Sequence, residues 1–388
     1  MIVGPSALVP TCRAGALLAA VFVAVSPLAG QSNDSRPATP RTEASKVSKS
    51  ARWSADVESK AGLQYDHNVF LLSSAQRAAL GSPSSEVSAS GRYESMESAN
   101  DMLAIGNIGL EVKGPGVGGR TLEISPSLSY EFASRNELRR EAAAALSIAQ
   151  SLGGGRRVRF RAEAAPNHFS RNYLEDAFDA DADGSISPAE RIYTKGEYAD
   201  YSVGGDLRLP LGRTRKTSLA VATAGLGYYA RSYNTPFAVR DLAGPTAALS
   251  LDVAPRAPLG LELTYELAAL SANAGRQVVL LDEAVYNVDF NGNGTATDLE
   301  ARAVVDVDRS RLEHQLGGAV TFGAGKKLAA TLGYDYRLRS FRSELPYDEN
   351  GAGRRDRRNG VRGSIRSRVS RSLTISAGAR FRSQTTNR

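Results

Sequence analysis

Two stretches of the chain place oxygen-bearing side chains at a fixed spacing within twelve residues. The first is DADADGSISPAE at 179–190, where oxygens stand at positions 1, 3, 5, 7, 9 and 12 and Gly184 stands at position 6. The oxygen-bearing residues are Asp179, Asp181, Asp183, Ser185, Ser187 and Glu190. This spacing lets a loop wrap around a calcium ion, because the glycine permits a sharp turn and the last glutamate can bind through both oxygens.

The second stretch is DFNGNGTATDLE at 289–300. Its ligand positions hold Asp289, Asn291, Asn293, Thr295, Thr297 and Glu300. Two asparagines replace aspartates in this loop, so we expect it to attract a divalent cation less strongly than the first loop does. The alternative interpretation is that both stretches are solvated acidic turns that bind no metal.

Both loops resemble the calcium loops of EF-hand and dockerin proteins, over the length of the loop alone. That resemblance implies calcium as a cofactor. The flanking sequence predicts neither a facing partner hand nor the Met-rich groove of a calcium switch, so we expect a structural role. Calcium bound only by the folded loop would hold a long surface segment in one shape.

The elements that carry these loops are predicted by a sequence period of two. In TLEISPSLSYEF at 121–132, apolar residues alternate with serines and glutamates. Successive side chains point to opposite faces only in a β-strand, so this spacing predicts strands rather than helices. The pattern predicts thirteen strands, at 53–65, 102–113, 121–133, 139–151, 156–170, 197–209, 217–231, 243–254, 261–273, 309–322, 327–342, 358–371 and 372–383.

The lengths of the strands and of their connections favour a membrane barrel over a soluble antiparallel sandwich. Many segments run about 10 to 14 residues, which suits a tilted transmembrane strand. Short connections such as 115–120 and 153–156 alternate with long ones such as 66–101 and 171–196. We therefore predict an all-β fold, an antiparallel up-and-down transmembrane β-barrel of 12–14 strands with long extracellular loops.

The sequence alone leaves the exact number of strands open. Bacterial single-chain barrels have an even number of strands, which brings both ends of the chain to the periplasmic side. The tail FRSQTTNR also lacks the terminal aromatic residue that outer-membrane barrels commonly carry. We expect an architecture of 14 strands whose last strand is missing from this chain, with 12 strands as the alternative.

The first residues predict export from the cytoplasm. Arg13 precedes the apolar run AGALLAAVFVAVSPLAG, which is short and bounded by small residues, as in a secretory signal peptide. We expect a signal peptide at 1–30, a flexible periplasmic tail at 31–52 and the barrel at 53–388; a membrane anchor is the alternative. The single cysteine, Cys12, lies in the segment to be removed, so no disulfide is expected. These features indicate the outer membrane of a Gram-negative bacterium.

Charged residues on the alternating strands point to the character of the lumen. Eight arginines fall at inward-facing positions if the apolar residues face lipid: Arg157, Arg159, Arg161, Arg362, Arg366, Arg368, Arg380 and Arg382. With a net charge of +7, such a lining would favour anions mildly. The alternative is an ordinary lining of ion pairs.

No residue pattern in the sequence identifies a catalytic centre. The three histidines, His67, His168 and His314, fall on different strands, and no spacing joins one of them to a serine or carboxylate partner. We therefore expect no enzymatic activity. The isoelectric point of about 9.5 would permit nucleic-acid binding, but the acidic outer loops argue against it.

The first strand ends in YDHNVF at 65–70. This resembles the Y-D-x-N-V-F signature near the first strand of several porin-like outer-membrane barrels, including those of exopolysaccharide-associated proteins and surface lipoprotein assembly modifiers. The chain has no helical repeat domain before its barrel, so the role of the assembly modifiers is not carried over. The resemblance implies a passive channel or an envelope-export component.

Two other functions fit the same sequence. A barrel with a plugged lumen could use calcium-ordered loops to attach to surface glycan, and a secreted soluble β-protein could bind calcium. The expected partners are outer-membrane lipid and either small solutes or surface glycan. The solute, the pore width and the oligomeric state are not specified by the sequence.

Overall fold

The computed structural model describes most of the chain from residue 52 onward. The described residues are 52–66, 68–70, 72, 74–80, 92–180, 186–213, 218–256, 259–281, 301–323, 327–345, 348, 352–368 and 374–387. Within them, no helix is both long enough and apolar enough to cross a membrane.

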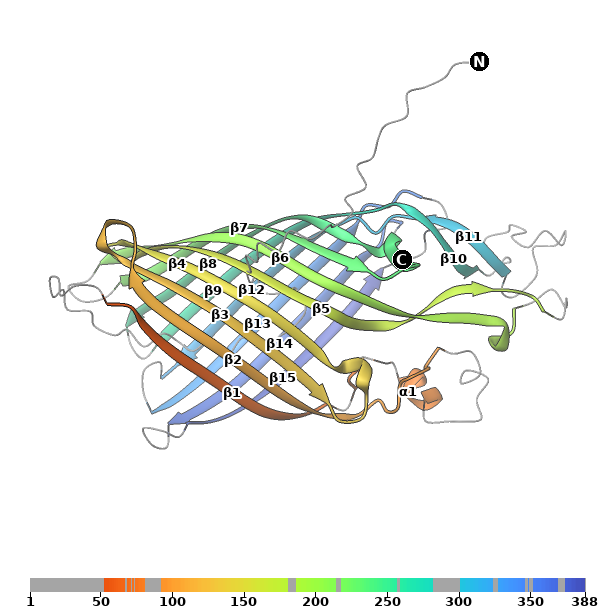
Figure 1. Ribbon diagram of the computed structural model, residues 1–388, viewed down its shortest axis with the longest axis horizontal. Helices are drawn as coiled ribbons and strands as arrows, with labels where there is room; N and C mark the ends of the chain where they lie inside the picture. Colours follow the sequence, from red (N-terminus) through yellow and green to blue (C-terminus); the bar gives the residue numbers. More distant parts are fainter. Residues whose placement is uncertain are drawn as a thin grey trace, which may run out of the picture.

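Within the described residues, thirteen strands form one antiparallel sheet, in which each strand between the two edge strands pairs with the strands on both sides of it. Figure 1 shows that this sheet curls into a barrel of tilted strands. The strands are β1 (Ser54–Asp66), β2 (Asp101–Pro115), β3 (Thr121–Ala133), β4 (Glu141–Gly153), β5 (Arg156–Ala177), β6 (Arg191–Arg213), β7 (Ser218–Tyr233), β8 (Leu242–Arg256), β9 (Leu259–Ala272), β12 (Arg311–Phe322), β13 (Leu328–Phe341), β14 (Arg355–Arg368) and β15 (Thr374–Asn387). The predicted fold class is confirmed.

Smaller elements gather at the end of the barrel that carries the long connections. Between β9 and β12, a separate hairpin of β10 (Gly275–Leu281) and β11 (Ala301–Val307) extends from the barrel. The helix α1 (Ser74–Leu80) lies at the same end (Figure 1). The described 3-10 turns at this end are η2 (Glu137–Arg139), η3 (Pro188–Glu190) and η4 (Phe237–Arg240), whereas η1 (Val117–Gly119) lies in the short turn between β2 and β3 at the opposite end.

The outer face of the barrel is apolar and exposed. On β3, Leu128, Tyr130 and Phe132 keep 55%, 46% and 40% of their surface, and the residues between them are less exposed. Similar exposed apolar residues occur on most strands, among them Leu226, Leu263, Leu332 and Ile365. A soluble sandwich buries these rows between two sheets, whereas a transmembrane barrel turns them outward to lipid.

The strands predicted from the sequence agree with the observed thirteen. The largest difference lies in β5 and β6, whose paired ends extend to Ala177 and Arg191, beyond the predicted limits at 170 and 197. Three register irregularities interrupt this extension, between Ala165 and His168, Phe169 and Arg171, and Leu174 and Asp176. They disturb the period of two from which the strand limits were predicted. The β10–β11 hairpin was missed, because both strands fall within a segment assigned to one long loop.

The two edges of the described sheet are β1 and β15. Because thirteen strands alternate in direction, β1 and β15 run the same way, and the described residues contain no ladder joining them. Nearly every residue of β1 is exposed, as expected for an edge strand. A fourteenth strand stays a prediction.

A buried polar contact holds the first two outer connections together. Asp101, at the start of β2, accepts hydrogen bonds from the backbone N–H of Ser134 (3.0 Å) and Asn136 (2.8 Å). The side chain of Asn136 in turn accepts from the backbone N–H of Glu97 (3.0 Å) and Ser98 (3.2 Å). Asp101 and Asn136 are almost completely buried, so these bonds fix both connections at the mouth of the barrel.

Candidate functional site

The YDHNVF stretch forms an anchor for the first outer connection. Asn68 donates its side-chain amide to the carbonyl of Leu72 (2.7 Å) and accepts the backbone N–H of Leu72 (2.8 Å). Val69 is buried against Leu103 and Ala133, and the Phe70 ring makes an edge-to-face contact with the ring of Phe169. These contacts of Asn68, Val69 and Phe70 hold the chain as it leaves β1. His67 lies outside the described residues.

The predicted lumen arginines of β5 lie on the face opposite its exposed apolar side chains. Val158 and Phe160 are exposed, whereas the alternating arginines are half-buried. Arg157 forms an ion pair with Glu123 of β3 (2.6 Å), and Arg159 and Arg161 form ion pairs with Asp206 of β6 (2.9 and 3.0 Å). Carboxylates on β3 and β6 thus offset much of this positive charge.

The predicted lumen arginines of the last two strands do not share one environment. Arg362 and Arg366 are half-buried and alternate with the exposed Val361 and Ile365. Arg368 and Arg382 are exposed. The backbone of Arg380 pairs with that of Arg362, but its side chain lies outside the described residues.

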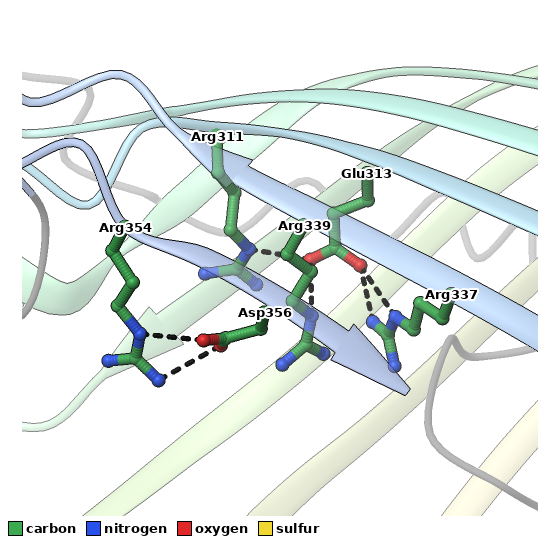
Figure 2. Close-up of polar contacts among 6 residues, drawn as sticks. All are labelled: Arg311, Glu313, Arg337, Arg339, Arg354 and Asp356. Atoms are coloured by element: carbon green, nitrogen blue, oxygen red, sulfur yellow. Dashed lines mark hydrogen bonds and ion pairs between the residues drawn. The ribbon is translucent and has the colours of Figure 1, made fainter. Parts of the chain in front are cut away.

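Near the loop end of β12 and β13, three arginines surround one carboxylate (Figure 2). We call Arg311, Glu313, Arg337 and Arg339 the Glu313 cluster. Arg311 donates Nε to a Glu313 oxygen at 2.5 Å, and Arg337 donates Nε at 3.0 Å and a second bond through Nη2. Arg339 Nε lies 3.3 Å from the same carboxylate. The side chain of Glu313 is 0% exposed, so all its charge is compensated inside the protein.

Strand geometry brings the Glu313 cluster together. Residues two apart on a strand share a face, so Arg311 and Glu313 project together from β12, and Arg337 and Arg339 project together from β13. The register pairs Glu313 with Arg339 and, across the next ladder, Arg339 with Asp356. Asp356 accepts two bonds from Arg354, at 2.8 and 2.9 Å, and extends the charged face to β14 (Figure 2).

Sequence reasoning missed the Glu313 cluster, although a signal was present. The repeated spacing of charged residues in RLE at 311–313 and RLR at 337–339 marks one polar face on each strand. The pairing of those faces depends on register, which the spacing does not specify.

A second band of charged and aromatic groups lies on β4 to β7. Asp200 accepts two bonds from Arg231, both at 2.8 Å, and one from the Tyr229 hydroxyl at 2.6 Å. His168 lies 2.9 Å from Glu141 and stacks on Tyr198. His314 contacts the Tyr265 hydroxyl at 2.9 Å on other strands, so the two described histidines belong to separate sites.

The first predicted calcium loop is described only in part. Asp181, Asp183 and Ser185 lie outside the described residues, as do all ligand positions of the second loop at 289–300. Glu190 is buried, and its two oxygens accept the backbone N–H of Ala180 (2.5 Å) and Ser187 (2.8 Å). Among the described residues no group of three acidic, histidine or cysteine side chains is placed to hold a metal. Calcium binding therefore stays a prediction.

The comparisons with known proteins place no family name on the chain. No protein-family model matches the sequence, and no curated protein matches it. Among solved structures, a match is the crystal structure of the siderophore receptor PirA from Pseudomonas aeruginosa, at 12% identity and a TM-score of 0.29. The alignment covers 74% of this chain and 58% of the receptor, so the chain spans less than two thirds of the receptor's length. An overlap this loose carries no argument about function.

Proposed function

We propose that the protein is a porin-like barrel of the outer membrane that passes small solutes or serves as a component of envelope export. The observation that supports this most directly is that single strands carry exposed apolar side chains on one face and charged side chains on the other. Val158 and Phe160 are exposed on β5, whereas Arg157, Arg159 and Arg161 alternate with them on the other face. A polar lumen would let solutes diffuse across the membrane without a catalytic residue.

The proposed channel favours anions mildly. The Glu313 cluster holds three guanidinium groups and one carboxylate, so its interior face keeps an excess of positive charge. On β5, by contrast, the arginines are paired with carboxylates, which weakens the field that a passing ion meets. The preference should accordingly be modest and should fall with ionic strength.

The proposed calcium loops would stiffen the outer connections. Support comes from the β5–β6 hairpin, which continues as paired strands up to the 179–190 loop. The backbone N–H groups of Ala180 and Ser187 both bond to Glu190, which closes the loop at its ends. Calcium would bind between these ends at an affinity of about 0.1 to 1 mM, as in extracellular modules.

The channel proposal is tested by conductance in planar lipid bilayers. The purified protein is first shown to be folded by the change in its gel migration on boiling. The folded protein is then inserted into the bilayer. Discrete conductance steps, with a reversal potential of the sign expected for anions under a potassium chloride gradient, are the expected result. Repeated insertion without steps would refute the channel and would favour the binding barrel with a plugged lumen.

The calcium proposal is tested separately, by limited proteolysis with and without a chelator. We expect the chelator to increase cleavage within 171–196 and 274–308, while the barrel remains intact. Glu190→Gln should reproduce the effect at 171–196 alone, because it removes the last ligand of the first loop only. Equal cleavage with and without calcium would remove the metal from the proposal.

A further inference from the structure

Next to the start of β12, a second group of arginines gathers around a neutral side chain. Arg240 of η4 donates Nη2 to the side-chain oxygen of Gln277 at 3.1 Å, and Arg309, two residues before β12, donates Nη2 to the same oxygen at 3.2 Å. The guanidinium groups of Arg240 and Arg171 also face the ring of Tyr173, at 3.7 and 5.0 Å from its centroid. We call these five residues the Gln277 cluster.

The Gln277 cluster has three guanidinium groups and, within the described chain, no carboxylate in an ion pair with any of them. Arg240 is only 6% exposed, and its Nε has no hydrogen-bond partner among the described residues. The Nε of half-buried Arg309 also has none. Asp348 acts electrostatically on Arg309, but it accepts the backbone N–H of Asp308 (2.9 Å) and forms no ion pair with Arg309 in the described structure.

Buried arginine donors are normally satisfied, because a charged group without a partner loses its hydration and gains nothing in return. Burial, followed by repulsion from Arg309, lowers the pKa of Arg240 to about 9. Burial also lowers the pKa of Arg309. Burial disfavours the charged form of both groups, and at Arg240 the neighbouring Arg309 adds to this, so a bound anion would stabilise the charged forms.

The surrounding residues hold the Gln277 cluster in place. Tyr173 lies over Gly196 of β6, where a Cβ atom would come within 2.3 Å of its ring, so only glycine leaves room for the ring. The Tyr173 hydroxyl is 2.8 Å from Ser170 Oγ, and Phe237 packs against the ring at 5.1 Å between centroids. The Tyr173 ring is thus held in place where it contacts the guanidinium groups of Arg240 and Arg171. Of these two arginines, Arg240 is buried and Arg171 is exposed to solvent.

We propose that the Gln277 cluster binds an oxyanion, the phosphate or carboxylate group of a small solute, at the outer end of the barrel. A planar guanidinium presents two parallel N–H groups that match two oxygens of such an anion. Arg240 and Arg309 supply buried Nε donors without a partner among the described residues, exposed Arg171 adds charge, and the Tyr173 ring contacts the guanidinium groups of Arg240 and Arg171.

This site deepens the proposed anion preference, yet it can be tested without conductance. Binding in detergent depends only on the folded outer end, so a barrel that does not conduct could still bind, and a channel could still conduct if this site failed. The probes are inorganic phosphate and citrate, measured separately by isothermal titration calorimetry on the full chain. A larger response to one of them distinguishes a phosphate from a carboxylate ligand.

The variants Arg240→Gln and Arg309→Gln each remove one charge from the Gln277 cluster. We expect each to weaken binding at least about tenfold, because a charge-assisted pair is lost. The matched control is Arg276→Gln, on exposed Arg276 next to Gln277, which removes the same charge outside the cluster. It should change the affinity less than about twofold.

Arg240→Lys keeps the charge but loses the planar fork, so it should bind more weakly than the native chain and more tightly than Arg240→Gln. A gel shift on boiling confirms that every variant is folded. Absence of binding by the native chain to both probes at about 10 mM overturns the proposal, since that concentration detects even weak sites. An equal loss in Arg276→Gln also overturns it, because general surface charge would then explain the binding.

Discussion

The Glu313 cluster and the Gln277 cluster each hold three arginines and differ in the side chain at their centre. In the Glu313 cluster, a fully buried carboxylate accepts bonds from Arg311 and Arg337 and pairs with Arg339. In the Gln277 cluster, the central side chain is a neutral amide that accepts from Arg240 and Arg309. The carboxylate binds its arginines into the wall of the barrel. The amide positions its arginines but leaves their charge for another partner.

The largest expected effect on stability comes from replacing the central carboxylate of the Glu313 cluster by an amide, as in the Gln277 cluster. Glu313→Gln would leave buried Arg337 and largely buried Arg311 without the carboxylate that they contact, so we expect the free energy of unfolding to fall by about 3–5 kcal/mol. Urea titration of the folded barrel in detergent, followed by the gel shift on boiling, measures this. A loss smaller than about 0.5 kcal/mol would mean that Glu313 does not hold the wall and that the comparison is wrong.

The reciprocal change supplies the missing carboxylate to the Gln277 cluster. Gln277→Glu should form ion pairs with Arg240 and Arg309 and compete with a bound anion, so phosphate affinity should fall about tenfold. Stability should rise slightly, because buried positive charge gains a partner. Titration calorimetry and urea unfolding report the two effects on the same sample. Unchanged phosphate affinity would show that the anion binds elsewhere.

The pH dependence of phosphate binding sharpens the comparison further. Burial lowers the pKa of Arg240 to about 9, so its guanidinium group keeps its charge below this value and loses it as the pH rises through it. Against the opposing effect of burial, Arg240 and Arg171 lower the pKa of Tyr173 to about 8, so this ring gains negative charge first. Phosphate is almost fully the dianion from about pH 8, so its affinity should fall several-fold between about pH 8 and pH 10. Other titratable or charged groups also act electrostatically on Arg240 or on Arg309: they are Arg171, Tyr173, Tyr233 and Asp348, and Arg309 itself acts on Arg240. Ionisation of either tyrosine would weaken binding in the same direction.

The control for this pH dependence is Arg240→Gln, in which the titrating group is absent. Its residual binding should vary less between the same pH values than that of the native chain. A fall in affinity of the same size in both proteins would assign the pH dependence to another group, such as a tyrosine of the cluster.

The strands could be predicted from the sequence because lipid and water impose a strict alternation on them. TLEISPSLSYEF keeps this alternation and was placed within one residue of β3. The β10–β11 hairpin escaped prediction because each of its strands has seven residues and they flank the 282–300 segment. The hairpin stands apart from the barrel, so no alternation across a membrane marks it.

The two arginine clusters could not be predicted from the sequence, for a different reason. The Glu313 cluster depends on the register between two neighbouring strands, which the charged spacing indicates only in part. The Gln277 cluster joins β5, η4, β10 and the start of β12, segments that lie more than 130 residues apart at their extremes, from Arg171 to Arg309. Only the fold brings these residues together. The predicted arginines of β5, namely Arg157, Arg159 and Arg161, instead have carboxylate partners.

The smallest effect is expected at an exposed ion pair near the same hairpin. Arg302 of β11 contacts Asp176 of β5 at 2.6 Å, but both side chains are at least 40% exposed, so water screens the pair. Arg302→Gln should therefore lower stability by only about 0.2–1 kcal/mol and leave phosphate affinity unchanged. Urea unfolding and calorimetry, with Arg240→Gln measured beside it, separate this result from a general loss of positive charge. A large loss of affinity in Arg302→Gln would mean that the position of the hairpin, rather than unpaired arginines, makes the site.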